Sequence, residues 1–143
     1  MPYRYLEGLT MADIAFEATG RTLEELFASA ADAMTNTQIQ DLGMIKPETE
    51  KKFDLKAANI EQLLHDFLQE LIFFKDAELL LFREYKVRIS EAQGGYLLEA
   101  NLKGEAIDMK RHIMLVDVKA VSWHKFKVEK TKEAWRAVVI IDV

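Results

Sequence analysis

A chain of 143 residues, half of them hydrophobic, is long enough to bury a substantial core as one domain over residues 1–143. The chain contains no cysteine, which excludes a disulfide framework, a thiolate nucleophile and a cysteine-ligated zinc or iron–sulfur site. The formal net charge of −5 argues against a stand-alone nucleic-acid-binding protein, because affinity for phosphate backbones depends largely on Lys and Arg.

The charge is unevenly distributed along the chain. From Lys110 to Arg136 there are eight Lys or Arg residues and three Asp or Glu residues. Such a run is typical of a solvated, charged edge of a sheet, and a binding face is the alternative.

The first residues lack the pattern of a signal peptide, and no apolar stretch reaches the ~18 residues of a membrane span. We therefore expect a soluble, cytoplasmic protein that makes no contact with a membrane.

The first part of the chain predicts two strands and a helix. Alternating aromatic and apolar residues predict short strands over 3–7 and 13–18. Thr22 and Glu25 form a capping box ahead of an apolar helical face, which predicts a helix that ends near residues 35–36.

A second helix has the clearest pattern in the chain. Asn59 and Gln62 repeat the start signal, and the apolar residues over 60–72 follow the i, i+3, i+4, i+7 spacing of an amphipathic helix. The segment before it, 48–57, alternates charged residues with apolar ones and predicts a half-exposed strand.

The rest of the chain is predicted to be mostly strand. The final run, 134–143, is almost entirely apolar and rich in β-branched residues, which indicates a strand buried on both faces. The pattern as a whole predicts an α+β fold: a single domain with a mostly antiparallel mixed sheet and two helices packed on one face. The other predicted segments are strands over 79–89, 96–102 and 112–128, a hairpin turn at Gly94-Gly95, an irregular stretch over 104–111 and a Lys-rich turn over 129–133.

Few residues point to chemistry. The chain has no Gly-rich phosphate loop, no His-Glu-x-x-His motif and no nucleophile elbow, and its three histidines are scattered, so each is expected to be structural. Asp13 stands among apolar residues at the start of a strand, and Asp142 lies next to the α-carboxylate of Val143 at the end of another. An ionised carboxylate in such a place requires a partner, water or a cation. From the residues alone, a solvated terminus and a cation site both remain open.

The sequence resembles the archease family over essentially its whole length. The first block, the Val-Lys-Ala segment and the Ile-Asp-Val end are the most specific parts of the match. The matching blocks are Met11-Ala12-Asp13-Ile14-Ala15-Phe16-Glu17-Ala18, then Gly20 and Thr22-Leu23-Glu24-Glu25-Leu26-Phe27, then Leu63-Leu64, Phe67-Leu68 and Glu70-Leu71, then Gly104-Glu105, Arg111-His112, Val118-Lys119-Ala120-Val121 and Ile140-Ile141-Asp142-Val143.

The resemblance implies a non-catalytic accessory protein of the tRNA-splicing RNA ligase, which joins RNA ends with GTP and manganese. It implies that the chain promotes guanylylation and multiple turnover of the ligase's catalytic subunit. By the same resemblance, Asp13, Asp142 and Val143 hold a divalent cation, and Lys119 is a further functional residue. Where the family commonly has His-Thr-Ala-Asp, this chain has Thr10-Met11-Ala12-Asp13 and so lacks the histidine.

A site made only of carboxylates is a hard oxygen site, which suits calcium first, with magnesium and manganese as alternatives, and does not suit zinc or copper. RNA is expected to be contacted only indirectly or weakly. Two other functions stay open from the sequence: a metal-dependent hydrolase that acts by itself, and a protein-interaction module that binds no metal.

Overall fold

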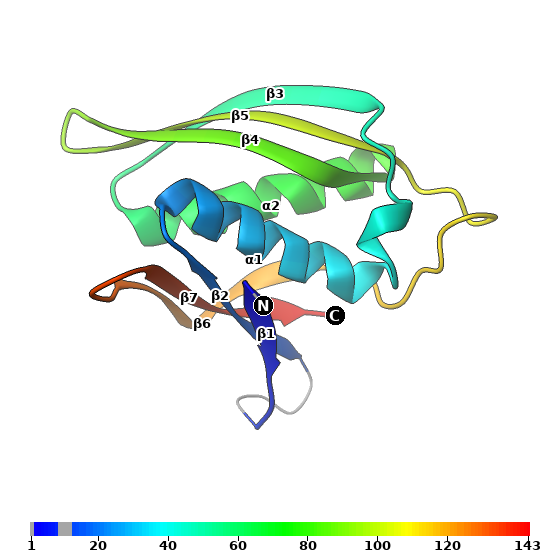
Figure 1. The fold of residues 1–143 in the computed structure, drawn as a ribbon, viewed down its shortest axis with the longest axis horizontal. Coiled ribbons are helices and arrows are strands. Elements are labelled where there is room, and N and C mark those ends of the chain that lie inside the picture. The colour runs from blue at the N-terminus through cyan, green and yellow to red at the C-terminus, as the bar shows by residue number, and fades with distance from the viewer. Residues whose placement is uncertain (1, 9–12) are drawn as a thin grey trace.

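The computed structural model describes residues 2–8 and 13–143 (Figure 1). In chain order the elements are β1 (Tyr3–Leu6), β2 (Ile14–Gly20), α1 (Leu23–Gln38), a short 3₁₀ helix η1 (Leu42–Met44), β3 (Thr49–Ala57), α2 (Ile60–Glu78), β4 (Leu80–Ala92), β5 (Gly95–Ala106), β6 (Ala120–Lys130) and β7 (Trp135–Asp142).

The strands form two antiparallel sheets, and both helices lie between them (Figure 1). One sheet has the order β1-β2-β7-β6 and the other has the order β3-β5-β4. The predicted α+β class is confirmed, but the strands divide into two sheets instead of forming one. The helices can fill the space between two sheets because their buried residues are not restricted to a narrow stripe. In α1 the buried set is Leu26, Phe27, Ser29, Ala30, Ala31, Ala33, Met34, Thr35, Thr37 and Gln38.

Both helices begin where the sequence predicts, and α1 extends further than predicted. The Thr22 hydroxyl accepts a hydrogen bond from Glu25 N, and the Asn59 side chain accepts one from Gln62 N. α1 continues to Gln38 because the hydroxyls of two buried threonines in its last turns donate to the carbonyls of Ala31 and Ala33. These bonds satisfy the threonines inside the helix, where their intrinsic preference is for other conformations.

The hairpin between β4 and β5 turns one residue earlier than predicted. Gln93 and Gly94 occupy the turn with φ of 45° and 79°, and Gly95 is the first residue of β5. Positive φ at both central residues matches the twist of the flanking strands, as in a type I′ turn.

The segment before β6 is the main departure from the predicted secondary structure. A strand was expected over 112–128, but β6 begins only at Ala120. Residues 113–115 run along the end of α1 instead: Gln40 N donates to Ile113 O over 2.9 Å, and Leu115 N donates to Gln38 O over 2.7 Å. These residues are extended, as their alternating pattern predicts, but their backbone groups bond to the end of α1 and not to a strand.

A buried ionic cluster attaches the loop after β5 to the body of the protein. Glu105 is 7% exposed and accepts hydrogen bonds from Lys46 N, Arg111 Nη2 and His112 Nε2 at 3.0, 2.7 and 2.8 Å. His112 Nδ1 accepts from Asp108 N, so Nε2 carries the ring proton and donates. Burial alone would raise the pKa of Glu105, but these hydrogen bonds and the Arg111 charge lower it to about 2.

β6 is an edge strand with a large bulge. Ser122 pairs with Ile140 and Lys127 pairs with Val138, so four residues of β6, from 123 to 126, lie opposite the single residue Val139. Within the bulge, Lys125 has a φ of 56°. Trp123 stacks on His65 of α2 with ring centroids 3.8 Å apart, which fixes the bulge against the helix.

Side chains of α2 complete the hydrogen bonding of the β6 segment that faces them. Val121 N donates to Gln69 Oε1 over 2.6 Å, and the Val121 carbonyl accepts from His65 Nε2 over 2.9 Å. Two side chains one helical turn apart thus pair with both backbone groups of one residue, as a neighbouring strand would.

Lys75 makes the third attachment from α2. The residue is 5% exposed. Its ammonium group donates to Val118 O over 2.9 Å and to Asp117 Oδ1 over 2.6 Å, with Asp76 as a further partner. Burial lowers the pKa of this ammonium, but the two carboxylates outweigh burial and the pKa is raised. Lys119 therefore lies between Val118, whose carbonyl accepts from Lys75, and Ala120, which pairs with Asp142 of β7.

We predict that Glu105 makes acid stability pH-dependent. Because its pKa is about 2 in the folded protein and near 4.5 ordinarily, its contribution is complete above about pH 4.5 and is lost as the pH falls toward 2. Glu105→Gln should lower the free energy of unfolding at pH 7 and flatten its decline between pH 5 and pH 3, measured by urea unfolding at each pH. Identical declines in the variant and the wild type would contradict the assignment.

We predict that Lys75→Met destabilises the protein locally as well as globally. The change leaves the Val118 carbonyl without its described side-chain donor and should cost roughly 1–3 kcal/mol in urea unfolding. Hydrogen exchange should accelerate at the amides of 118–121 more than in β5. Lys52→Met, at an exposed position of β3, is the matched control and should change neither quantity.

Candidate cation site at the end of the four-stranded sheet

The pairing of β2 with β7 brings the two predicted aspartates together. Ile14 and Ile141 are paired partners, and Asp13 directly precedes β2 while Asp142 is the last residue of β7. In an antiparallel pair, the residue before one partner lies opposite the residue after the other. The register therefore places Asp13 and Asp142 side by side at one end of the sheet.

β6 brings Lys119 to the other side of the same position. Ala120 pairs with Asp142, and Lys119 N donates to Asp142 O over 2.8 Å. Val143 follows Asp142 directly and packs against the hydrophobic core. The four residues predicted from the sequence, although up to 130 positions apart, thus lie at one end of three adjacent strands.

The residues at this end differ in exposure in a way that suits a surface site. Asp13, Asp142 and Val143 are half-buried, while Lys119 is exposed and its neighbour Val118 is fully buried. The packed Val143 side chain and the pairing of Asp142 with Ala120 hold residues 142 and 143 in place at this end of the sheet.

The oxygen groups available here fit a hard divalent cation held by few protein ligands. Within residues 2–8 and 13–143, no group of three His, Cys, Asp or Glu side chains is placed to hold a metal ion. A cation at this end would have the Asp13 and Asp142 side chains as its acidic ligands, with the α-carboxylate of Val143 as the third ligand that the family resemblance implies. Calcium, magnesium and manganese accept such oxygen ligands and keep the remaining positions for water or a partner's atoms. Thr10, Met11 and Ala12, which stand where the family commonly has His-Thr-Ala, lie outside the described residues.

The two buried histidines have structural roles, as predicted. His65 and His112 are 8% and 3% exposed, and Nε2 of each ring is hydrogen-bonded to a backbone carbonyl or to Glu105. His124 is exposed in the β6 bulge. Neither buried ring is available as a general base for a reaction at the Asp13–Asp142 end.

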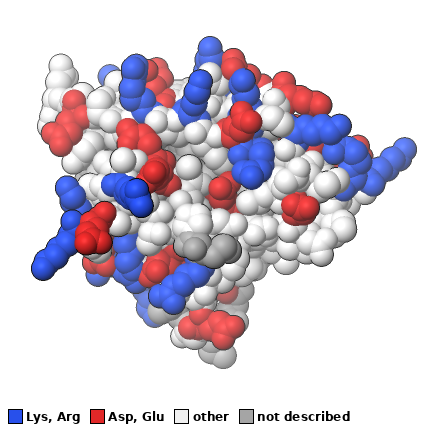
Figure 2. Space-filling view, in the orientation of Figure 1, with Lys and Arg blue, Asp and Glu red and all other residues white. Residues whose placement is uncertain are grey.

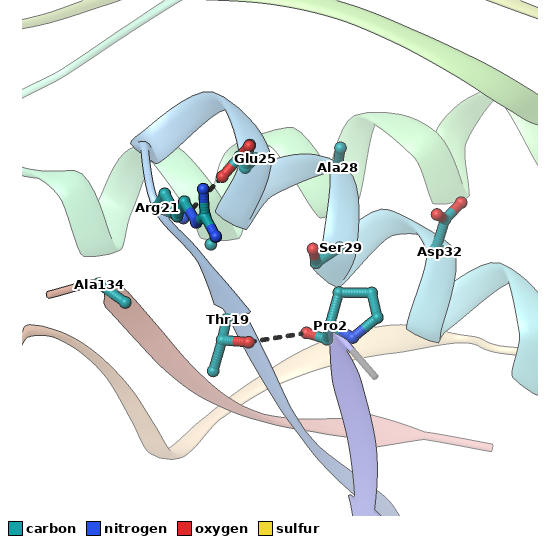
Figure 3. Close-up of a pocket in the computed structure, with 9 residues that line it drawn as sticks. Pro2, Thr19, Arg21, Glu25, Ala28, Ser29, Asp32 and Ala134 are labelled. Carbon is teal, nitrogen blue, oxygen red and sulfur yellow. Dashed lines mark hydrogen bonds between the residues drawn. The ribbon is translucent and has the colours of Figure 1, made fainter.

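A hollow lies at the opposite end of β2 (Figure 3). Its lining includes Arg21, Ser29 and Asp32, and Thr19 Oγ1 donates to Pro2 O over 3.3 Å. Burial raises the pKa of Asp32, which Arg83, at 3.9 Å, lowers only in part. At ~3.3 Å per residue, the seven residues of β2 separate this hollow from Asp13 by about 20 Å. It shares none of the predicted site residues.

Charges on the molecular surface are mixed. On the face shown in Figure 2, Lys and Arg side chains are interspersed with Asp and Glu. Several basic residues of the 110–136 run are already paired with acids, as Arg136 is with Glu17 and Glu129. This arrangement agrees with the solvated-edge interpretation of the run more than with a continuous phosphate-binding surface.

Sequence reasoning missed the residues that hold Lys119 in place. Gln69 and Lys75 were not singled out, although Lys75 gave a signal: it follows Leu71 and Ile72 at helical spacing and so occupies a position where α2 should be apolar. A lysine at a buried helical position requires a partner, and here the partner is the segment that leads to Lys119.

None of the helices in the described part of the chain is both long and apolar enough to cross a bilayer.

The model of the Archease protein family (MTH1598/TM1083) matches residues 3–143. The chain is 37% identical to the archease of Methanosarcina barkeri, covering 99% of this chain and 95% of that protein, and 32% identical to the archease of Pyrococcus abyssi, covering 92% and 93%.

Solved structures agree with these matches. The solution structure of Methanobacterium thermoautotrophicum protein 1598 superposes with a TM-score of 0.86 at 32% identity, covering 99% of both chains. The crystal structure of an archease from Thermotoga maritima has a TM-score of 0.64 at 21% identity, covering 94% of this chain and 93% of that one, and shows the shared fold. The chain therefore belongs to the archease family.

Proposed function

We propose that this protein activates the GTP-dependent tRNA-splicing RNA ligase, promoting its guanylylation and multiple turnover through a divalent cation at the Asp13–Asp142 end. Membership of the archease family supports the proposal. The observation that carries it is the convergence of Asp13, Asp142, Val143 and Lys119 on three adjacent strands.

The chemistry of the four residues suits an activator that works at a partner's reactive phosphate. Two side-chain carboxylates and the α-carboxylate would hold calcium, or magnesium or manganese, with positions left over for a ligand from the partner. When bound, the cation would supply positive charge near phosphate oxygens. Lys119, on an exposed segment fixed by Lys75 and by Asp142, adds a compact ammonium group beside it.

A hydrolase that acts by itself has less support. Such an enzyme needs a base with a free ring or carboxylate near the metal-bound water, and the rings of His65 and His112 are both engaged in structural hydrogen bonds. A metal-free interaction module would leave Asp13, Asp142 and the α-carboxylate close together without a cation, where like charges repel. Multiple-turnover RNA ligation by the cognate ligase, with and without this protein, separates the activator from both alternatives.

We predict that Asp142→Ala weakens divalent-cation binding by about tenfold or more without unfolding the protein, because one of three oxygen ligands is lost. Asp13→Ala should act similarly, and so should an extension of a few residues after Val143, which moves the α-carboxylate away from the site. Calorimetric titration with calcium measures the effect. Asp54→Ala, exposed on β3, is the control, and wild-type affinity in all three altered chains would rule out the site.

We predict that Lys119→Ala keeps the fold and the cation but loses the stimulation of ligase guanylylation. An exposed lysine contributes little to stability, whereas a nearby cation stabilises a transferring phosphoryl group. Transfer of radiolabelled GMP onto the ligase, with equal concentrations of wild type and variant, is the measurement. Lys56→Ala, an exposed lysine of β3, should stimulate like the wild type. Full stimulation by Lys119→Ala would show that this ammonium group has no part in activation.

A further inference from the structure

We propose that an apolar groove beside Asp13 is the surface on which the ligase docks, so that a partner side chain enters the groove while the partner's reactive site reaches the cation. The groove is defined by Tyr5, Leu6, Asp13, Leu115 and Val116 and is called the Leu115 groove below. The inference rests on the proposed function and adds the contact surface that it requires.

The groove gathers large apolar side chains that folding leaves uncovered. Tyr5, Leu115 and Val116 are 44%, 53% and 42% exposed, and all three line the same hollow. Exposed apolar residues scattered singly need no explanation, but several that line one depression are typical of an interaction site. Covering them would remove apolar surface from water, at roughly 25 cal/mol per Å².

The walls of the groove are held by hydrogen bonds and are thus formed before a partner arrives. The Tyr5 hydroxyl donates to Ala33 O of α1 over 2.8 Å. Leu115 N donates to Gln38 O over 2.7 Å, and the neighbouring Met114 pairs with Ile39. A surface fixed in this way loses little conformational entropy on binding.

The position of Asp13 indicates what the partner offers. Asp13 lines the groove and also lies beside Asp142 at the candidate cation site, so a protein that supplies a ligand to the cation would lie next to the groove. The combination of an apolar hollow and an anionic end complements a protein surface with an apolar side chain next to basic or metal-coordinating groups.

The same features disfavour two other occupants. A nucleic acid would place few apolar groups in the hollow, which Tyr5, Leu115 and Val116 line. In a twofold dimer of this chain seated on the groove, both copies would bring the same anionic end into one buried interface, where like charges repel. The protein partner of the proposed function is therefore the occupant that fits best.

The experiment replaces the apolar side chains of the groove and measures binding to the ligase. The variant carries Leu115→Ser and Val116→Ser, and the matched control is Phe73→Ser, at a side chain of α2 with 57% exposure. Affinity for the purified, full-length cognate ligase is measured by biolayer interferometry. Calcium affinity by calorimetry and the urea midpoint are measured on the same samples.

The groove variant should bind the ligase at least about tenfold more weakly, with calcium affinity and urea midpoint unchanged, while Phe73→Ser binds like the wild type. Unchanged ligase affinity in the groove variant would overturn the docking assignment while leaving the proposed function intact. Failure of the wild type to bind or stimulate the ligase would instead overturn the proposed function, and the docking assignment with it.

Two further measurements identify a wrong occupant. Concentration-dependent dimerisation of the wild type, seen by sedimentation and lost in the groove variant, would assign the groove to a second copy. Binding of single-stranded RNA by the wild type that is lost in the variant would assign it to nucleic acid. Either result overturns the ligase assignment.

Discussion

The placement of β7 between β2 and β6 is the constraint on which the rest of the structure depends. Its side chains Val139, Ile140 and Ile141 are at most 1% exposed, so this strand joins the core to both neighbours of its sheet. Ala137, Val139 and Ile141 share the face of β7 that packs in the main core, and a slip of one residue would turn all three to the other face, so this alternation fixes the register. The same register sets Asp13 and Lys119 on either side of Asp142, so the packing of the core determines the geometry of the candidate site.

Local signals in the sequence predicted most helices and strands. How the strands pair depends on long-range contacts, which local signals do not show. The caps at Thr22 and Asn59 lie where the sequence placed them, because capping depends on residues within one turn. The division of the strands into two sheets depends on which strands pair, and periodicity carries no information on that. Residues 113–115 have the alternation of a strand, but their partner is the end of α1, which alternation alone cannot identify.

The candidate site was predicted in its parts more than in its arrangement. Asp13 and Asp142 were recognisable as acids at the ends of apolar strands, and Lys119 came from the family resemblance. Their proximity required the β2–β7 and β6–β7 pairings. The partners that His65, Gln69 and Lys75 find in the Lys119 segment, residues 118–121, could not be foreseen, because each of these bonds joins residues more than 40 positions apart.

The bulge of β6 also affects how the molecule behaves at high concentration. An edge strand with free N–H and C=O groups is a template for the strands of other molecules, and such pairing leads to aggregates. Here residues 123–126 interrupt the regular ladder, and Lys125 bends the backbone through a positive φ. Next to the bulge, α2 side chains occupy both backbone groups of Val121. The contacts that hold the Lys119 segment thus also make this edge a poor surface for strand addition, which disfavours aggregation.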